Sequence, residues 1–218
     1  MPADQITPAI RLRITFEKNE SMRFTSHLDL HRAWERTVRR AGLPLAYSHG
    51  FNPRPKLNLA SALPLGFTSD CELIDIWLES EMPVENIKNA LESAQPPGLK
   101  ILDIEVISLD APKLQKQVQS SEYLVTILDF IPDLANQLQT LLEADSIIRT
   151  RRGRDYDLSN LIEDVSYLST NDESHQQFSL LLKTQANATG RPDEVLAELD
   201  IPIQTANIKR TQIFLNNN

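Results

Sequence analysis

The residues between Ser26 and Lys56 hold the side chains best suited to chemistry in this sequence. Their spacing predicts a helix with an apolar face, which includes Leu30 and Trp34, and an opposite basic face. The basic face consists of Arg32, Arg36, Arg39 and Arg40. Because the guanidinium fork matches phosphate in charge and shape, this face indicates anion binding. An ordinary solvated helix face remains the alternative.

The two ends of this helix are marked in the sequence. Ser26 followed by Asp29 resembles a capping box, with the acidic side chain at the positive end of the helix dipole. Gly42 suits the left-handed backbone that often ends a helix, and Pro44 prevents the helix from resuming. We therefore expect the helix to begin after Ser26 and to end before Gly42.

A loop from 47 to 56 follows, because the segment is too rich in Gly and Pro for a helix or a central strand. Its candidate contact residues are His49, Phe51, Arg54 and Lys56. Phe51 is suited to stacking on a base beside the two cations, or alternatively to anchoring the loop on the core. His49 is the best candidate general base for a metal-independent RNA cleavage, with Tyr47 to orient it. A ring that stacks or caps the loop is the alternative.

A second basic cluster occurs in the other half of the chain. It consists of Arg149, Arg151, Arg152 and Arg154. Gly153 allows a tight bend within the cluster. A hairpin made soluble by charge, or paired with Asp155 and Asp157, is the alternative to phosphate binding. If this cluster faces the first, the two arginine groups line one cleft for a phosphate chain.

The charge of the chain is unevenly distributed. The net charge is −8, yet residues 11–60 contain ten Lys or Arg against four Asp or Glu, and residues 61–148 contain four against fifteen. The acidic total argues against a general polyanion binder. A basic region on an acidic chain favours a directed anionic ligand.

Few residues are suited to metal binding or to known enzyme motifs. The single cysteine, Cys71, is predicted to be a small core residue, with a reactive thiol as the alternative. His27 and His31 are one helical turn apart, but no acidic or sulfur partner is evident nearby, so we expect no metal. The nucleotide-binding, hydrolase and zinc-protease motifs are missing. The chain has neither a signal peptide pattern nor a membrane span, so we expect a cytoplasmic protein.

The apolar periodicity predicts an α+β fold. In the first half, the order strand, helix, strands, helix, strand is that of a split βαβ sheet of the ferredoxin type, and the second half repeats it more loosely. We therefore expect tandem ferredoxin-like modules with antiparallel sheets, residues 1–112 and 113–218, with 110–120 as a linker or strand margin. The expected strands are 10–16, 57–62, 71–78, 99–109, 122–130, 146–152, 178–185 and 206–215. The expected helices are 27–41, 83–94, 132–142 and 191–199, while 157–168 fits either type.

Several stretches together resemble a known family of unknown function. They are RFTSHLDLHRAWERTVRRAGLPLAYSHGFNPRPKLNLASALPLGFTSDCELIDI, RTRRGRDYDL, ATGRPDEVLAEL and IKRTQIF. They are similar to the radical-SAM-associated, or radical-SAM-linked, family, whose members accompany cobalamin-binding radical-SAM proteins. The resemblance implies a radical-SAM partner that carries an iron–sulfur cluster and S-adenosylmethionine. One cysteine cannot hold such a cluster, so we expect this chain to bind no cofactor itself.

A shorter likeness joins the helix and loop to CRISPR RNA-processing endoribonucleases, which are similar in having tandem ferredoxin-like folds. The main prediction is an accessory RNA-binding or substrate-presenting module that acts with a radical-SAM modifying enzyme. The alternatives are a metal-independent endoribonuclease with His49 as its base, and a protein-interaction scaffold for the radical-SAM partner. The chain is more consistent with an accessory protein than with an enzyme on its own.

Overall fold

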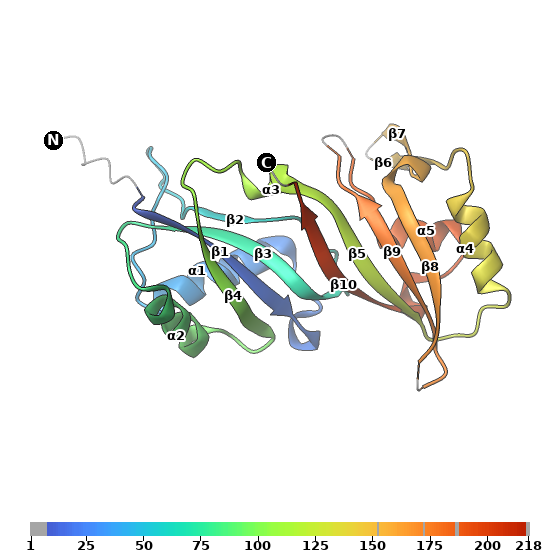
Figure 1. Cartoon of the computed structure of the whole chain (residues 1–218), viewed down its shortest axis with the longest axis horizontal. Helices are drawn as coiled ribbons and strands as arrows, with labels where there is room; N and C mark the ends of the chain where they lie inside the picture. Colours follow the sequence, from blue (N-terminus) through green and yellow to red (C-terminus); the bar gives the residue numbers. More distant parts are fainter. Residues whose placement is uncertain (1–7, 152, 172, 186–187, 217–218) are drawn as a thin grey trace. The chain divides into compact units, whose positions relative to one another are not determined.

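The computed structural model describes residues 8–151, 153–171, 173–185 and 188–216. The chain divides into two compact units, Met1–Gln117 (unit 1) and Val118–Asn218 (unit 2). Within each unit the strands described pair antiparallel, with helices between them (Figure 1). The predicted α+β class with antiparallel sheets is therefore confirmed.

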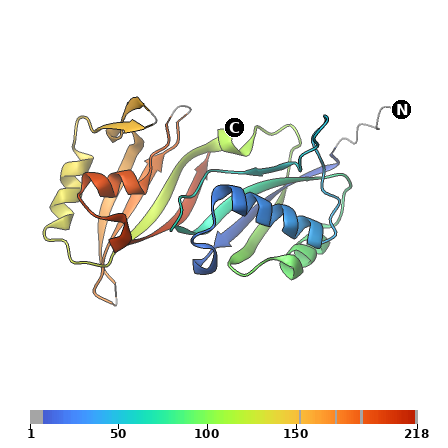
Figure 2. The ribbon, with the colours of Figure 1, turned by 180° about the vertical axis from the view of Figure 1, so that it is seen from behind.

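In unit 1, β1 lies between β4 and β3, and β2 pairs with the other edge of β3. The elements are β1 (Ile10–Lys18), α1 (His27–Arg40), β2 (Leu57–Leu59), β3 (Thr68–Leu78), α2 (Val84–Ala94), β4 (Leu99–Ile107) and α3 (Leu114–Gln117). Helices α1 and α2 cover the same face of these strands (Figure 2). The opposite basic face of α1 is consequently left toward solvent.

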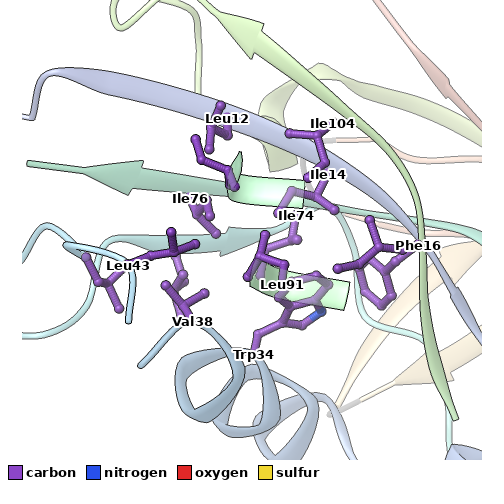
Figure 3. Packing of buried hydrophobic residues seen from close by; sticks show 14 of the residues in the cluster. Leu12, Ile14, Phe16, Trp34, Val38, Leu43, Ile74, Ile76, Leu91 and Ile104 are labelled. Atoms are coloured by element: carbon purple, nitrogen blue, oxygen red, sulfur yellow. The ribbon is translucent and has the colours of Figure 1, made fainter. Parts of the chain in front are cut away.

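The core of unit 1 forms between this sheet face and the two helices. Figure 3 shows Trp34 and Val38 of α1 directed toward Phe16, Ile74 and Ile76 of the strands. The rings of Phe16 and Trp34 pack edge to face with centroids 4.9 Å apart. These side chains are fully buried, so they hold α1 in one rotation about its axis.

The other face of β1 carries two basic side chains that are paired inside the protein. Arg11 and Arg13 both form ion pairs with Asp75 of β3, at 2.6 and 2.9 Å, and Arg11 and Asp75 are almost wholly buried. Arg11 also donates hydrogen bonds to the carbonyls of Ala111 and Pro112. Two of the cations counted in the basic region are thus neutralised inside the protein and cannot meet a ligand.

The segment 110–120 is more ordered than a linker. It contains α3 and the first residues of the next strand, because Leu114 and Val118 are buried. The prediction for Cys71 is also wrong, since this residue is only partly buried on β3. The side chain of Gln117 accepts a hydrogen bond from Arg13 at 3.2 Å, which fixes the end of unit 1 to its first strand.

Unit 2 has the strand order β10-β5-β9-β8, and a separate hairpin formed by β6 and β7. The elements are β5 (Val118–Ile127), α4 (Leu134–Leu142), β6 (Ile148–Arg151), β7 (Arg154–Asp157), β8 (Ile162–Thr170), β9 (Gln176–Lys183), α5 (Pro192–Glu198) and β10 (Ala206–Leu215). The ambiguous segment 157–168 is mostly strand, because it pairs with β9. The first strand starts four residues before the expected Glu122.

No helix among the described residues combines the length and the apolar character that crossing a membrane requires.

Candidate functional site

Both ends of α1 are built as the sequence predicts. The backbone N–H of Asp29 donates to Ser26 Oγ at 3.1 Å, and the Ser26 hydroxyl donates to the Asp29 carboxylate at 2.7 Å. These contacts, together with Arg32, hold the pKa of Asp29 below its usual value. Gly42 has a φ of 69°, the left-handed conformation expected at the helix end. The basic face of α1 therefore begins and ends at defined positions.

The four arginines of this face have different surroundings. Arg32 pairs with Asp29 at 3.1 Å, one turn away on the same helix. Arg40 instead donates to the carbonyl of Ala94, at the end of α2. Arg36 is exposed and forms no ion pair with any residue that the structure describes. The face is therefore partly neutralised, and Arg36 is its open cation.

Arg39 connects α1 to the loop. It pairs with Glu35 at 2.9 Å and donates to the hydroxyl of Tyr47 from Nε at 3.1 Å and from Nη2 at 2.9 Å. The bond to Tyr47 and the nearby Glu35 raise the pKa of Arg39. The Tyr47 hydroxyl thus accepts its hydrogen bonds from Arg39. The contacts do not support the expected role of Tyr47 in orienting His49.

The loop is a short hairpin, which we call the 47–56 hairpin. Tyr47 and Pro55 form an antiparallel bridge. The backbone N–H of Ser48 donates to the carbonyl of Arg54 at 2.8 Å, and the N–H of Arg54 donates to Ser48 Oγ at 2.9 Å. At its base, the N–H of Trp77 on β3 donates to the carbonyl of Lys56 at 3.2 Å. The hairpin is thus held by β3 on one side and by Arg39 on the other.

The tip of the 47–56 hairpin projects into solvent. Phe51 is fully exposed, so the alternative that it anchors the loop on the core is wrong. Gly50 has a φ of 125°, a conformation that side chains rarely adopt and that turns the chain just before Phe51. His49 and Arg54 are exposed as well, and Lys56 is partly exposed. The ring of Phe51 is therefore accessible for stacking on a ligand.

We name these groups the unit 1 basic surface. It comprises Arg32, Arg36, Arg39, His49, Phe51, Arg54 and Lys56. Within the described part of the chain, Arg36, Arg54 and Lys56 form no ion pair. Arg40 is excluded from it because its guanidinium is directed to the end of α2. The surface therefore joins three open cations to one exposed aromatic ring.

Three arginines of the second cluster, Arg149, Arg151 and Arg154, lie on one face of the β6–β7 hairpin. Residues opposite each other in an antiparallel pair share a face, and Arg149 is opposite Tyr156 while Arg151 is opposite Arg154. Arg149 pairs with Glu198 of α5 at 2.5 Å, whereas Arg151 and Arg154 are exposed. Arg152 lies outside the described residues. The prediction that both arginine clusters line one cleft stays a prediction.

Among the described residues, neither Asp155 nor Asp157 forms an ion pair with an arginine of this cluster. Asp155 accepts a hydrogen bond from Thr150, and Asp157 accepts from Ser159 and from the backbone N–H of Ile147. These hydrogen bonds lower the pKa of Asp157. The local sequence gave no sign of these partners, because hairpin register decides which side chains meet.

The two histidines of α1, His27 and His31, lie one helical turn apart. His27 is partly buried, and burial and the neighbouring His31 lower its pKa, while Glu72 acts in the opposite direction. Among the residues that the structure describes, no group of three or more His, Cys, Asp or Glu side chains is arranged to hold a metal.

Residues 11–192 match the model of a family described as "Uncharacterized protein conserved in bacteria (DUF2344)". No curated protein matches the chain. Similar solved structures include "Crystal Structure of a Cbf5-Nop10-Gar1 Complex", with 10% identity, a TM-score of 0.49 and coverage of 94% of this chain and 50% of that chain. Another is "Structure of H/ACA RNP bound to a substrate RNA containing 2'-deoxyuridine", with 10% identity, a TM-score of 0.47 and coverage of 94% and 49%. This chain thus spans about half the length of those chains, and at these scores the likeness carries no argument.

Proposed function

We propose, from the premise that this chain belongs to the DUF2344 family, that it is an accessory RNA-binding or substrate-presenting module. The observation that carries the proposal is the fully exposed ring of Phe51, which shares with Arg54 a hairpin that Arg39 fastens to α1. Proteins that bind single-stranded RNA combine cations for the backbone with aromatic rings on which bases stack. The unit 1 basic surface has both.

The distribution of charge supports RNA binding at the two arginine groups and not over the rest of the chain. Arg36, Arg54 and Lys56 form no ion pair among the described residues, whereas Arg11 and Arg13 are both paired with Asp75. The net charge of −8 repels RNA from the rest of the chain. Phosphates are therefore bound at the unit 1 basic surface, and Arg151 and Arg154 in unit 2 supply a second phosphate-binding group.

The proposed partner is a radical-SAM modifying enzyme. This step rests on the resemblance of the SHLDL, RRAGLPLAYSHGFNPRP and LPLGF stretches to the radical-SAM-associated family. The partner carries the iron–sulfur cluster and S-adenosylmethionine, since the single Cys71 of this chain cannot supply the thiolates of a cluster. In this division of labour the chain described here holds the RNA and its partner performs the chemistry.

We further propose that each unit is a ferredoxin-like module. In that fold four strands alternate with two helices as βαββαβ, and in space the first and third strands lie at the centre of the sheet. The orders β4-β1-β3-β2 in unit 1 and β10-β5-β9-β8 in unit 2 support this proposal. In unit 2 the β6–β7 hairpin is then an insertion between the first helix and the second strand.

RNA binding is tested with a labelled short single-stranded RNA and fluorescence anisotropy at several salt concentrations. The double variant Arg36→Gln/Arg54→Gln loses two phosphate contacts, so we expect affinity at least about tenfold lower and a salt slope smaller by about 2. Lys116→Gln, an exposed cation on α3, is the matched control and leaves both unchanged. An unchanged slope in the double variant, or no RNA binding at low salt, overturns the proposal.

The same RNA separates the proposal from its alternatives. Discrete cleavage without added metal that disappears in His49→Ala establishes an endoribonuclease instead of an accessory module. Retained binding without cleavage supports the accessory module. Isolation of the chain from its native cells, with the associated proteins identified, tests the radical-SAM partner, and recovery of that partner without RNA favours the scaffold.

A further inference from the structure

Unit 2 contains a cavity that the proposed function does not explain. Its volume is about 1000 Å³, and it is lined by residues of β6 and β7, by Asn160 and Leu161, and by Gln185, Ala188 and Thr189, which follow β9. The side chains that matter for its chemistry are Arg151, Arg154, Tyr156, Asn160, Gln185 and Thr189. This size is at the upper end of pockets that bind small molecules, so a single nucleotide fits within it.

The cationic part of the cavity is the end of the hairpin. Arg151 and Arg154 are opposite each other in the register, so their side chains leave the same face of the hairpin. Neither forms an ion pair with a residue that the structure describes, whereas Arg149 further along is paired with Glu198. Two adjacent guanidiniums that are not taken up in ion pairs are suited to a phosphate group with two negative charges.

The two carboxylates of the cavity are held by other groups. Asp155 accepts from the Thr150 hydroxyl at 2.5 Å, and Asp157 accepts from the backbone of Ile147 at 2.8 Å and from the Ser159 hydroxyl at 2.8 Å. Their charge still disfavours a second anionic group. The cavity is consequently suited to a ligand with one anionic end and an uncharged remainder.

The remainder of the cavity is uncharged and partly aromatic. Asn160 and Gln185 offer amide donors and acceptors, as the edges of nucleobases require, and Tyr156 offers a ring. Burial and the neighbouring Glu194 carboxylate raise the pKa of the Tyr156 hydroxyl, so this side chain stays uncharged.

We propose that this cavity binds one nucleoside monophosphate unit, with its phosphate on Arg151 and Arg154 and its base among Tyr156, Asn160 and Gln185. The inference deepens the proposed function, because Arg151 and Arg154 were there assigned only to phosphates of RNA in general. The same chemistry occurs in a free nucleotide and in the 5′-phosphorylated end of an RNA strand. The experiment includes both.

Isothermal titration calorimetry of the full chain with 5′-AMP and 5′-GMP, and with the two nucleosides, tests the cavity. The nucleotides are expected to bind at least about tenfold more tightly than the nucleosides, since a charge-assisted hydrogen bond contributes roughly 1.5–3 kcal/mol. The double variant Arg151→Gln/Arg154→Gln removes this difference, and Arg36→Gln/Arg54→Gln in unit 1 leaves it unchanged. Equal binding of nucleosides and nucleotides, or binding that survives Arg151→Gln/Arg154→Gln, overturns the inference.

A second titration uses one short RNA with and without a 5′-phosphate. If the strand end is the ligand, the 5′-phosphate increases affinity in the wild-type chain and not in Arg151→Gln/Arg154→Gln. If the free nucleotide is the ligand, Arg151→Gln/Arg154→Gln lowers the affinity for mononucleotides, and the 5′-phosphate of the RNA has no effect on affinity. RNA binding without any nucleotide binding overturns the inference and leaves the proposed function standing. Nucleotide binding without RNA binding at the unit 1 basic surface overturns the proposed function and leaves the inference standing.

Discussion

The guanidinium of Arg39 donates two hydrogen bonds to the hydroxyl of Tyr47, at 3.1 and 2.9 Å, and so ties the last turn of α1 to the base of the 47–56 hairpin. The guanidinium also lies over the Tyr47 ring, 5.9 Å from its centroid. This link sets where Phe51 and Arg54 lie with respect to α1, because the rest of the hairpin is exposed.

Tyr47→Phe tests the link. The variant keeps the ring but removes the hydroxyl that accepts both hydrogen bonds. We expect RNA affinity to fall by about threefold to tenfold, because a less ordered hairpin must be ordered on binding. The melting temperature should change little, since the bonds are exposed. Tyr167→Phe serves as the control, because Tyr167 is an exposed tyrosine of β8 in unit 2, outside the unit 1 basic surface. Unchanged RNA affinity in Tyr47→Phe contradicts the role given to the link.

Phe51→Ala tests base stacking at the hairpin tip. A base stacked on an aromatic side chain contributes about 1–3 kcal/mol, so we expect RNA affinity to fall by about fivefold or more. Thermal stability should not change, because the ring is fully exposed and packs on nothing. Leu65→Ala, another exposed apolar side chain in unit 1, should leave RNA affinity unaltered. Fluorescence anisotropy measures the RNA affinity of both variants, and thermal melting measures their stability. Equal loss in the two variants indicates nonspecific surface effects.

Asp75→Ala tests the buried ion pairs of unit 1. The variant leaves the guanidinium of Arg11 buried without its counter-charge, and Arg13 loses the same partner. Removing one member of a buried pair costs about 3–5 kcal/mol, which we expect as a large loss in the free energy of unfolding. Urea unfolding measures it. A loss below about 1 kcal/mol, the range of exposed pairs, contradicts the buried arrangement.

The pH dependence of stability tests the environment of His27. Burial and His31 lower its pKa, so the folded state binds its proton less readily than the unfolded state. The stabilising contribution is therefore present above the unfolded value of about 6.5 and is lost as the pH falls through the lower folded value. Urea unfolding at pH 7.5 and pH 5 should show a smaller pH effect in His27→Gln than in the wild-type chain. If the free energy of unfolding changes with pH equally in His27→Gln and in the wild-type chain, His27 does not contribute to the pH dependence of stability.

Sequence patterns predicted the local features of unit 1 well. The N-cap Ser26 and the left-handed Gly42 bound α1 because capping depends on residues within one turn of the helix end. The alternation from Ile10 to Phe16 predicted β1 for a similar reason, since the two-residue repeat of a strand is local. The burial of Arg11 was not predicted, because its partner Asp75 is 64 residues away.

The candidate site was predicted in kind rather than in detail. The sequence indicated arginines on α1, an irregular loop and a second arginine cluster. It left open whether Phe51 anchors the loop or projects from it, and its full exposure decides that question. It also gave no sign that Asn160 and Gln185 line a cavity with Arg151, since residues so far apart meet only through the pairing of strands.

By itself, the sequence determined the α+β class, the bounds of α1 and the positions along the chain where cations are concentrated. Those properties follow from periodicity, capping and composition, all of which act over a few neighbouring residues. Only the tertiary structure decided which cations remain open. Arg13 is neutralised across β1 and β3, Arg39 is shared with Tyr47, and Arg36 is left exposed. The physical reason is that the charge offered to a ligand depends on partners that folding brings together from distant parts of the chain.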